Sequence, residues 1–219
     1  MITLLHGNYS ESSRKEFIRL KEEAKAKDIR VLDGRSLDAA ALTQATESNS
    51  MFGGDTIVFI ENLFGKLGRK QKLIEALAAI INKSSADIIL WEDKEVGATV
   101  LKNLPNAKIA LFKIPSVIFQ MLDGIAPGAA IRDVPPEAPE LIFAMIVRRV
   151  RQLIQLRDGI VPEGLQGWQA SRLTRQAKLF TMDKLLHMYK TLLNMEYSVK
   201  NGSSPFTTAQ YIEQFLLDV

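Results

Sequence analysis

Cysteine is absent from this chain of 219 residues, and only two residues are histidine. Without cysteine there can be no disulfide, no thiolate-bound zinc, no iron–sulfur cluster and no cysteine nucleophile. Because His6 and His187 lie far apart in the sequence, a metal site would have to consist mostly of carboxylates. We therefore expect neither a metal nor another cofactor.

Long apolar runs are also missing. No uncharged apolar stretch approaches the ~20 residues that a membrane-spanning helix needs. The first residues, MITLLHGNYSESSRK, lack the basic leader and the apolar core of a secretory signal. These features predict a soluble, cytoplasmic protein that does not contact a membrane.

Neither sign of charge is in large excess. The chain has 28 Lys and Arg against 25 Asp and Glu, a net charge of +3, and the two signs are nearly balanced on both sides of residue 115. A module that binds nucleic acid by itself usually has a strongly basic region. We expect DNA binding to be weak, or to occur only within a complex, through a local patch.

Five short apolar runs, rich in β-branched residues, punctuate the first half of the chain. Each is nearly unbroken by polar residues, which is typical of strands buried on both faces of a parallel sheet. Helical periodicity lies between them, in residues 10–27 and 70–82 for example. This alternation predicts a three-layer α/β domain over residues 1–115. The expected strands are Ile2–His6, Ile29–Leu32, Thr56–Ile60, Asp87–Trp91 and Lys108–Phe112.

The pattern changes after Phe112. Prolines repeatedly interrupt residues 116–137, which we interpret as a linker. Three long helical segments and a short one follow, so residues 138–219 are predicted to form an all-helical bundle. The expected helices are Pro139–Arg157, residues 165–180, a helix from Met182 that stops at Asn201-Gly202, and a last helix capped by Thr207.

The first expected strand runs into Gly7, where a nucleotide-binding fold has its phosphate loop. A working loop has the pattern GxxxxGK[ST], in which glycines turn backbone N–H groups inward and the lysine meets the phosphates. Here Ser12 and Ser13 stand at the positions of the second glycine and the lysine. We interpret this turn as a degenerate phosphate loop.

The other candidate catalytic groups are isolated. Glu61 ends the third expected strand, but Asn62 follows it where an active ATPase has a second acid, so a structural role is favoured. The glycine-rich basic residues 65–70 follow the wrong strand for a phosphate cradle and are better interpreted as a solvated loop. No catalytic partner is identifiable for either histidine.

The acidic pairs are most simply explained as solvated surface. Glu22-Glu23 and Glu92-Asp93 are the two examples. No set of catalytic residues can be identified from the sequence.

Two large apolar residues, Met51 and Phe52, follow Ser50 and precede a Gly-Gly turn. If exposed, such side chains would suggest a docking site for a partner. From the residues alone, core packing is the better interpretation.

Five arginines gather on two consecutive expected helices. Solvation of the helix faces is the simpler interpretation, and contact with DNA phosphates or with another subunit is the alternative. The residues are Arg148, Arg149, Arg151, Arg172 and Arg175.

The order of these parts resembles the delta subunit of the bacterial DNA polymerase III clamp loader, a relative of AAA+ ATPases without ATPase motifs. LLHGN is similar to the family's first strand and degenerate loop, SMFGGDTIVFIENL to its apolar-Phe turn and third strand, and ADIILWED to its fourth strand. The segment WQASRLTRQAKLFTMDKLLHMYKTLLNMEYSVKNG resembles the paired helices of the family's collar domain. That segment closes with Glu196, Lys200 and Gly202.

The resemblance implies an AAA+/RecA-like α/β domain followed by a collar-like bundle, in a non-catalytic subunit of the DNA polymerase III holoenzyme. It also implies that Ser50, Met51 and Phe52 bind the ring-shaped sliding clamp and help to open it during DNA replication. Other clamp-loader subunits would pack against residues 138–219. The family's small lid domain is missing from this chain, which suggests a short form of the subunit.

Two alternatives come from other functional classes. One is a nucleotide-dependent enzyme with an atypical phosphate loop. The other is a nucleic-acid-binding adaptor that uses the arginines of the second half.

Overall fold

The computed structural model describes the chain except for residues 26–27, 48–55, 66, 69, 130–133 and 136–137. The chain divides into two compact units, Met1–Ile114 and Pro115–Val219. All five described strands belong to the first unit, and the described elements of the second are helices.

The first unit alternates strands and helices from its first residues. Each strand begins within one residue of its expected position. The elements in chain order are β1 (Ile2–Gly7), α1 (Ser10–Glu23), β2 (Asp28–Asp33), α2 (Ala39–Glu47), β3 (Thr56–Glu61), α3 (Gln71–Lys83), β4 (Asp87–Trp91), α4 (Ala98–Asn103) and β5 (Ala107–Phe112).

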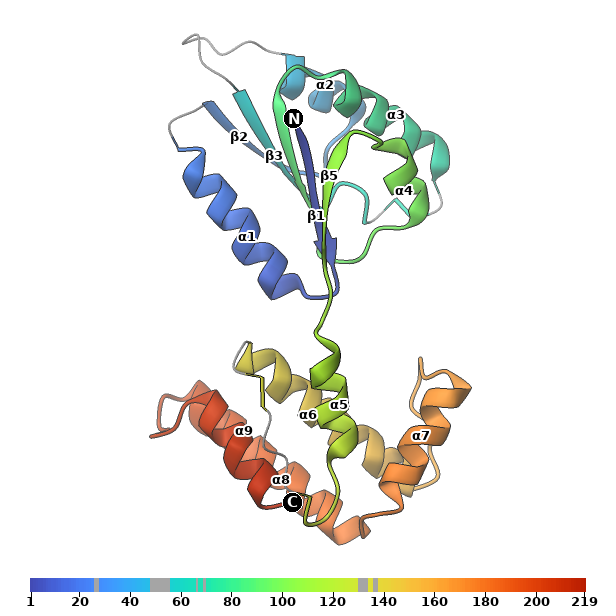
Figure 1. Ribbon diagram of the computed structural model, residues 1–219, viewed down its shortest axis with the longest axis vertical. Helices are drawn as coiled ribbons and strands as arrows, with labels where there is room; N and C mark the ends of the chain where they lie inside the picture. The colour runs from blue at the N-terminus through green and yellow to red at the C-terminus, as the bar shows by residue number, and fades with distance from the viewer. Residues whose placement is uncertain (26–27, 48–55, 66, 69, 130–133, 136–137) are drawn as a thin grey trace. The chain divides into compact units, whose positions relative to one another are not determined.

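The five strands form one parallel sheet in the order β2-β3-β4-β1-β5. Helix α1 covers one face, and α2, α3 and α4 cover the other (Figure 1). The three-layer α/β architecture predicted from the sequence is therefore confirmed.

Consecutive residues of the central strands point into two separate cores. Leu4 packs with α2, α3 and α4, whereas Leu5 packs with Phe17 of α1. Val58 and Phe59 of β3 alternate in the same way. The central strands have apolar residues at successive positions because both faces of the sheet are buried there.

The edge strands differ from the expectation of burial on both faces. In β5, Ile109 and Leu111 are exposed, and in β2 Val31 is exposed. The expectation was wrong for these two strands because an edge strand has a neighbour on one side only and its helical cover is incomplete.

The second unit consists of five described helices. Helix α6 is its centre, because it contacts α5, α7, α8 and α9. Its buried residues Ile142, Ile146, Val150 and Leu153 follow helical spacing. The helices are α5 (Ser116–Gly124), α6 (Pro139–Arg157), α7 (Gly167–Ala177), α8 (Met182–Lys200) and α9 (Thr208–Leu217).

The helix ends expected from capping residues are confirmed. Thr207 accepts a hydrogen bond from the Gln210 N–H while the Gln210 side chain accepts one from the Thr207 N–H, which is a capping box. Helix α8 ends before Gly202, whose φ of 64° is in the left-handed region.

Part of the expected linker is helical. Residues 116–124 form α5, and Ile118, Met121 and Leu122 of this helix are buried. The contact between α5 and α6 assigns this helix to the second unit.

Candidate functional site

The turn after β1 occupies the place of a phosphate loop but is too short to be one. Only Asn8 and Tyr9 separate β1 from α1. The Tyr9 N–H donates to the carbonyl oxygen of Phe112 on β5, at 3.1 Å, and the Asn8 side chain accepts from the Ile114 N–H. The turn therefore directs these polar groups at the end of β5 and the residues just after it, and it forms no cradle for a phosphate.

Ser13, which stands at the position of the phosphate-loop lysine, lies in the first turn of α1. Ser13 is fully buried; its Oγ donates to the Ser10 carbonyl and accepts a hydrogen bond from the Trp91 indole N–H at 3.0 Å. Because its hydroxyl is bonded within the protein, Ser13 does not face a ligand. The degenerate loop is thus part of the packing between α1 and β4.

Arg14 occupies the position of the magnesium-binding hydroxyl of a phosphate loop and binds the carboxylate that ends β3. Its Nη1 lies 2.5 Å from Glu61 Oε2, and its guanidinium lies 4.8 Å from the Trp91 ring centroid. Arg14 neutralises the Glu61 carboxylate at the place where an ATPase would hold a metal ion. This ion pair agrees with the structural role expected for Glu61.

A hollow of about 410 Å³ lies at the carboxyl ends of β2, β3 and β4. Its charged lining residues are Arg14, Arg35, Asp33 and Glu61, so its charges cancel. A hollow whose lining charges cancel offers little attraction to a nucleoside triphosphate.

Glu92 is buried, which corrects the expectation of a solvated acidic pair. Its carboxylate accepts hydrogen bonds from the Phe64 and Gly65 N–H groups, at 2.8 and 2.9 Å. Burial raises the pKa of Glu92, and these backbone hydrogen bonds oppose the rise. The backbone N–H groups of the loop after β3 therefore bind the protein's own Glu92 carboxyl group.

His6 is also buried and has no catalytic partner among the described residues. Its Nδ1 accepts a hydrogen bond from the Val96 N–H at 3.2 Å, and its Nε2 has no partner in the described part of the chain. Burial lowers the pKa of His6. The neutral form of His6 is therefore favoured as a core residue.

In the helical unit, Asp123 at the end of α5 binds two arginines. Arg149 of α6 donates to Asp123 Oδ1 at 2.9 Å and to Gln176 Oε1 at 2.7 Å, and Arg172 of α7 also pairs with Asp123. Gln176 in turn donates to the carbonyl oxygens of Leu122 and Ile125. Burial lowers the pKa of Arg149 to about 10. We call Asp123, Arg149, Arg172 and Gln176 the Asp123 cluster; it ties α5, α6 and α7 together.

The five arginines therefore do not form one patch. Arg149 and Arg172 belong to the Asp123 cluster, which the sequence did not indicate because Asp123 lies in the expected linker. Arg148, Arg151 and Arg175 are exposed. Contact of these residues with DNA or another subunit stays a prediction.

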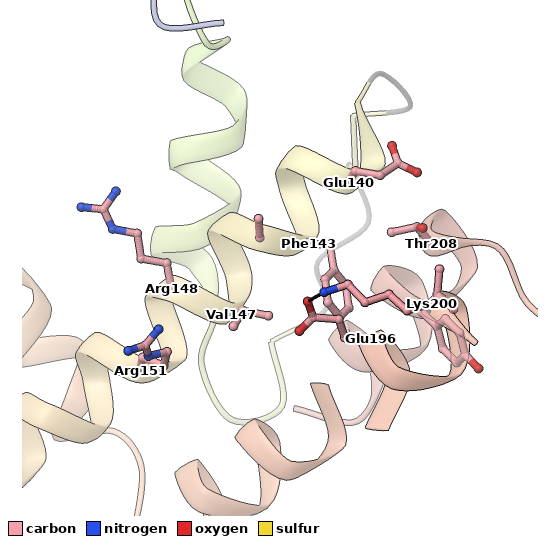
Figure 2. Close-up of a pocket in the computed structure, with 11 residues that line it drawn as sticks. Glu140, Phe143, Val147, Arg148, Arg151, Glu196, Lys200 and Thr208 are labelled. Atoms are coloured by element: carbon pink, nitrogen blue, oxygen red, sulfur yellow. Dashed lines mark hydrogen bonds and ion pairs between the residues drawn. The ribbon is translucent and has the colours of Figure 1, made fainter. Parts of the chain in front are cut away.

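The residues that close α8 lie beside a groove. Lys200 Nζ is 2.6 Å from Glu196 Oε1, and both line a cavity between α6, α8 and α9 that Figure 2 shows. Arg148 and Arg151 line the same cavity. No pattern in the sequence indicates this groove, because its walls come from three different helices that only the fold brings together.

Ser50, Met51 and Phe52 lie outside the described residues. Their role in clamp binding stays a prediction.

Two absences hold for the described part of the chain. No three His, Asp or Glu residues come together there in a way that could hold a metal ion. No described helix is long and apolar enough to cross a membrane.

Comparison with known proteins gives a structural similarity only. No protein-family model and no curated protein matches the chain. A solved structure of the Bacillus subtilis DNA clamp loader delta protein YqeN matches with a TM-score of 0.50 and 15% identity, over 99% of this chain and 94% of that chain. The similarity shows that this chain has a fold like that of the clamp loader delta protein.

Two structures of Drosophila ORC bound to DNA and Cdc6 match less well. Their TM-scores are 0.34 and 0.35, with 15% and 13% identity, over 87% of this chain and 75% and 74% of the matched chains. These similarities are too low to support an argument.

Proposed function

We propose that the chain is a non-catalytic, delta-like clamp-loader subunit that binds the DNA sliding clamp and helps to open it during replication. ATP hydrolysis by other subunits would then time the release of the clamp. The chain would act mechanically within a DNA polymerase III complex and bind no nucleotide itself.

One observation carries this proposal: an AAA+-like sheet in which protein groups replace the nucleotide site. Two residues replace the phosphate loop, and Arg14 neutralises Glu61 at the end of β3. An enzyme with an atypical phosphate loop would still need backbone N–H groups and a cation directed at the phosphates. The geometry of the turn supports the non-catalytic function over that enzyme.

The clamp contact is proposed for Met51 and Phe52, with Ser50 before them. This assignment comes from the resemblance of SMFGGDTIVFIENL to the family's clamp-binding turn. Burying two such side chains would contribute roughly 3–6 kcal/mol before the cost of ordering. That is enough to bias a ring interface without fixing the ring permanently.

Other loader subunits are proposed to pack against the helical unit. Leu186, Leu193 and Tyr197 of α8 are exposed at 49%, 43% and 72%. Their spacing of seven and four residues puts them on one face of the helix. An exposed apolar stripe of this kind supports packing between helical units, as in a collar.

The decisive experiment measures binding of the full chain to the sliding clamp of the same organism by surface plasmon resonance. Met51→Ala/Phe52→Ala should abolish binding and leave the thermal unfolding curve unchanged. Leu217→Ala, which truncates an apolar side chain that is 84% exposed in the helical unit, is the matched control and should bind normally. A folded chain that does not bind, or a double variant that binds or unfolds, would refute the assignment.

Calorimetric titration with Mg-ATP distinguishes the non-catalytic subunit from the alternative, a nucleotide-dependent enzyme with an atypical phosphate loop. If the chain is a delta-like subunit, the titration with Mg-ATP should give no heat of binding. If binding is found and Arg14→Ala removes it, the hollow at the end of β3 is a nucleotide site and the non-catalytic assignment is wrong.

A further inference from the structure

The groove between α6, the last turns of α8 and the start of α9 has an apolar floor. We call it the α6–α9 groove; its volume is about 320 Å³ (Figure 2). Phe143, Val147, Val199 and Tyr211 supply the apolar surface. A volume of this size lies at the lower end of the range for sites that enclose small ligands or a few side chains.

The floor offers apolar surface rather than free polar groups. Phe143 and Tyr211 are each only 8% exposed, while Val199 at the edge is 40% exposed. The Tyr211 hydroxyl already accepts a hydrogen bond from Ser204 Oγ at 2.9 Å. A ligand would therefore gain mainly from burying apolar side chains here.

The charges of the groove are separated along α6. Glu140 lies at one end, and Arg148 and Arg151 lie towards the other (Figure 2). At a rise of about 1.5 Å per residue, eight and eleven residues place the arginines about 12 and 16 Å from Glu140 along the helix. Phe143 and Val147 of the apolar floor lie between these charges in the sequence of α6.

The two arginines have no acidic partner within the described part of the chain. In contrast, Lys200 in the same groove pairs with Glu196 at 2.6 Å, and Arg149 on the same helix pairs with Asp123. Arg148 and Arg151 are also exposed. Unpaired cations beside an apolar floor are complementary to a segment that carries both acids and large apolar side chains.

We infer that the α6–α9 groove binds a partner-protein segment in which acidic residues stand next to two or more large apolar residues. The acids would face Arg148 and Arg151, and the apolar side chains would cover Val147 and Val199. This inference goes beyond the proposed function and does not depend on clamp binding, which is assigned to the other unit.

Nucleic acid fits this groove less well. Glu140 and Glu196 line it together with the cations, so a polyanion would meet two carboxylates. The Tyr211 ring is nearly buried, which leaves little aromatic face on which a base could stack.

A display library of random peptides of about twelve residues, panned against the full chain, tests the inference. Enriched peptides should combine Asp or Glu with neighbouring Leu, Ile or Phe. Fluorescence anisotropy of synthetic copies should then show a Kd raised about tenfold or more by Arg148→Glu/Arg151→Glu. Because both side chains are exposed, circular dichroism of this variant should match that of the unchanged chain.

Two controls make the experiment specific. Arg175→Glu reverses an exposed arginine on α7 that does not line the groove, and it should change the Kd by less than about twofold. Peptides in which lysine replaces the acids should regain affinity for the charge-reversed variant.

Three outcomes would overturn the inference. The first is a library without enrichment. The second is enriched peptides whose affinity the double reversal leaves unchanged. The third is a labelled single-stranded oligonucleotide that binds through Arg148 and Arg151 more tightly than the peptides do.

Discussion

At the scale of single residues, Asp123 pairs with two arginines that differ in exposure. The Arg149 side chain is 11% exposed and the Arg172 side chain 50%. Removing the buried Arg149 would leave Gln176 Oε1 without this donor and Asp123 with only the exposed Arg172, whereas an exposed pair contributes little. We expect Arg149→Met to lower the free energy of unfolding by about 2–4 kcal/mol and Arg172→Met by less than about 1 kcal/mol.

Urea unfolding followed by circular dichroism measures both losses, and hydrogen exchange of α5 locates them. In Arg149→Met, Gln176 loses the hydrogen bond from Arg149 that helps to position its side chain. Because Gln176 donates to the carbonyl oxygens of Leu122 and Ile125 at the end of α5, amide exchange in α5 should become faster. Equal losses for the two variants would mean that burial does not govern this cluster.

Glu92 leads to a prediction about pH. Because burial raises its pKa, the folded state binds this proton more tightly than the unfolded state does. The free energy of unfolding should therefore fall as the pH rises from about 4.5, the ordinary value, through the raised pKa. Glu92→Gln removes the titrating group, so its stability should depend less on pH across this window than that of the unchanged chain.

Urea midpoints on both sides of the window test the Glu92 prediction. Glu163→Gln changes an exposed glutamate of the helical unit and is the control. Its stability should depend on pH in the same way as that of the unchanged chain. Parallel profiles for the unchanged chain and Glu92→Gln would contradict the argument.

Glu92 also marks a limit of sequence reasoning at this scale. Glu92-Asp93 follows a strand, and nothing in these residue types distinguishes a solvated acid from one bound by backbone N–H groups. The partners, Phe64 and Gly65, lie 28 and 27 residues away. Only the parallel pairing of β3 with β4 brings their ends together.

At the scale of elements, the close approach of β1 to β5 requires glycine at position 7. Gly7 has a φ of 141°, and a Cβ added there would lie 1.9 Å from the Phe112 carbonyl oxygen. Such an overlap would force the ends of the two strands apart. We expect Gly7→Ala to destabilise the first unit by about 3 kcal/mol or more, measured by the fluorescence of Trp91 during urea unfolding.

Gly97→Ala is the matched control in the same unit. Gly97 precedes α4 with a φ of −72°, and an added Cβ would meet nothing within 4 Å. The cost should stay below about 1 kcal/mol. If Gly7→Ala is tolerated as well as this control, the end of β1 does not require glycine.

The elements most accurately predicted from sequence are those whose residues repeat a strong local pattern. Unbroken apolar runs located the strands, and Pro139 and Thr207 located helix starts, because these signals are local. Helices α2 and α4 were expected only from the alternation of strands and helices, without bounds, and α5, which lies in the expected linker, was not predicted. They have nine, six and nine residues, which is too short for a clear periodic stripe, and contacts elsewhere in the fold stabilise them.

At the scale of the whole molecule, clamp binding and peptide binding by the α6–α9 groove are proposed for different units. Met51 and Phe52 belong to Met1–Ile114, and the α6–α9 groove belongs to Pro115–Val219. Each unit has its own buried core, which is the condition for independent folding. The functions should therefore be separable by dividing the chain between Ile114 and Pro115.

We expect residues 1–114 to unfold cooperatively and to retain clamp binding that Met51→Ala/Phe52→Ala abolishes. Residues 115–219 should unfold cooperatively as well, bind the acidic-apolar peptides, and not bind the clamp. Calorimetry measures the cooperativity of unfolding of each piece, and the clamp and peptide assays measure its binding, with the full chain as the reference in each case.

Clamp binding by residues 115–219 alone would move the contact away from Met51 and Phe52. Loss of cooperative unfolding in either piece would show that each unit needs the other, because a unit with a self-sufficient core would keep a sharp transition after the division.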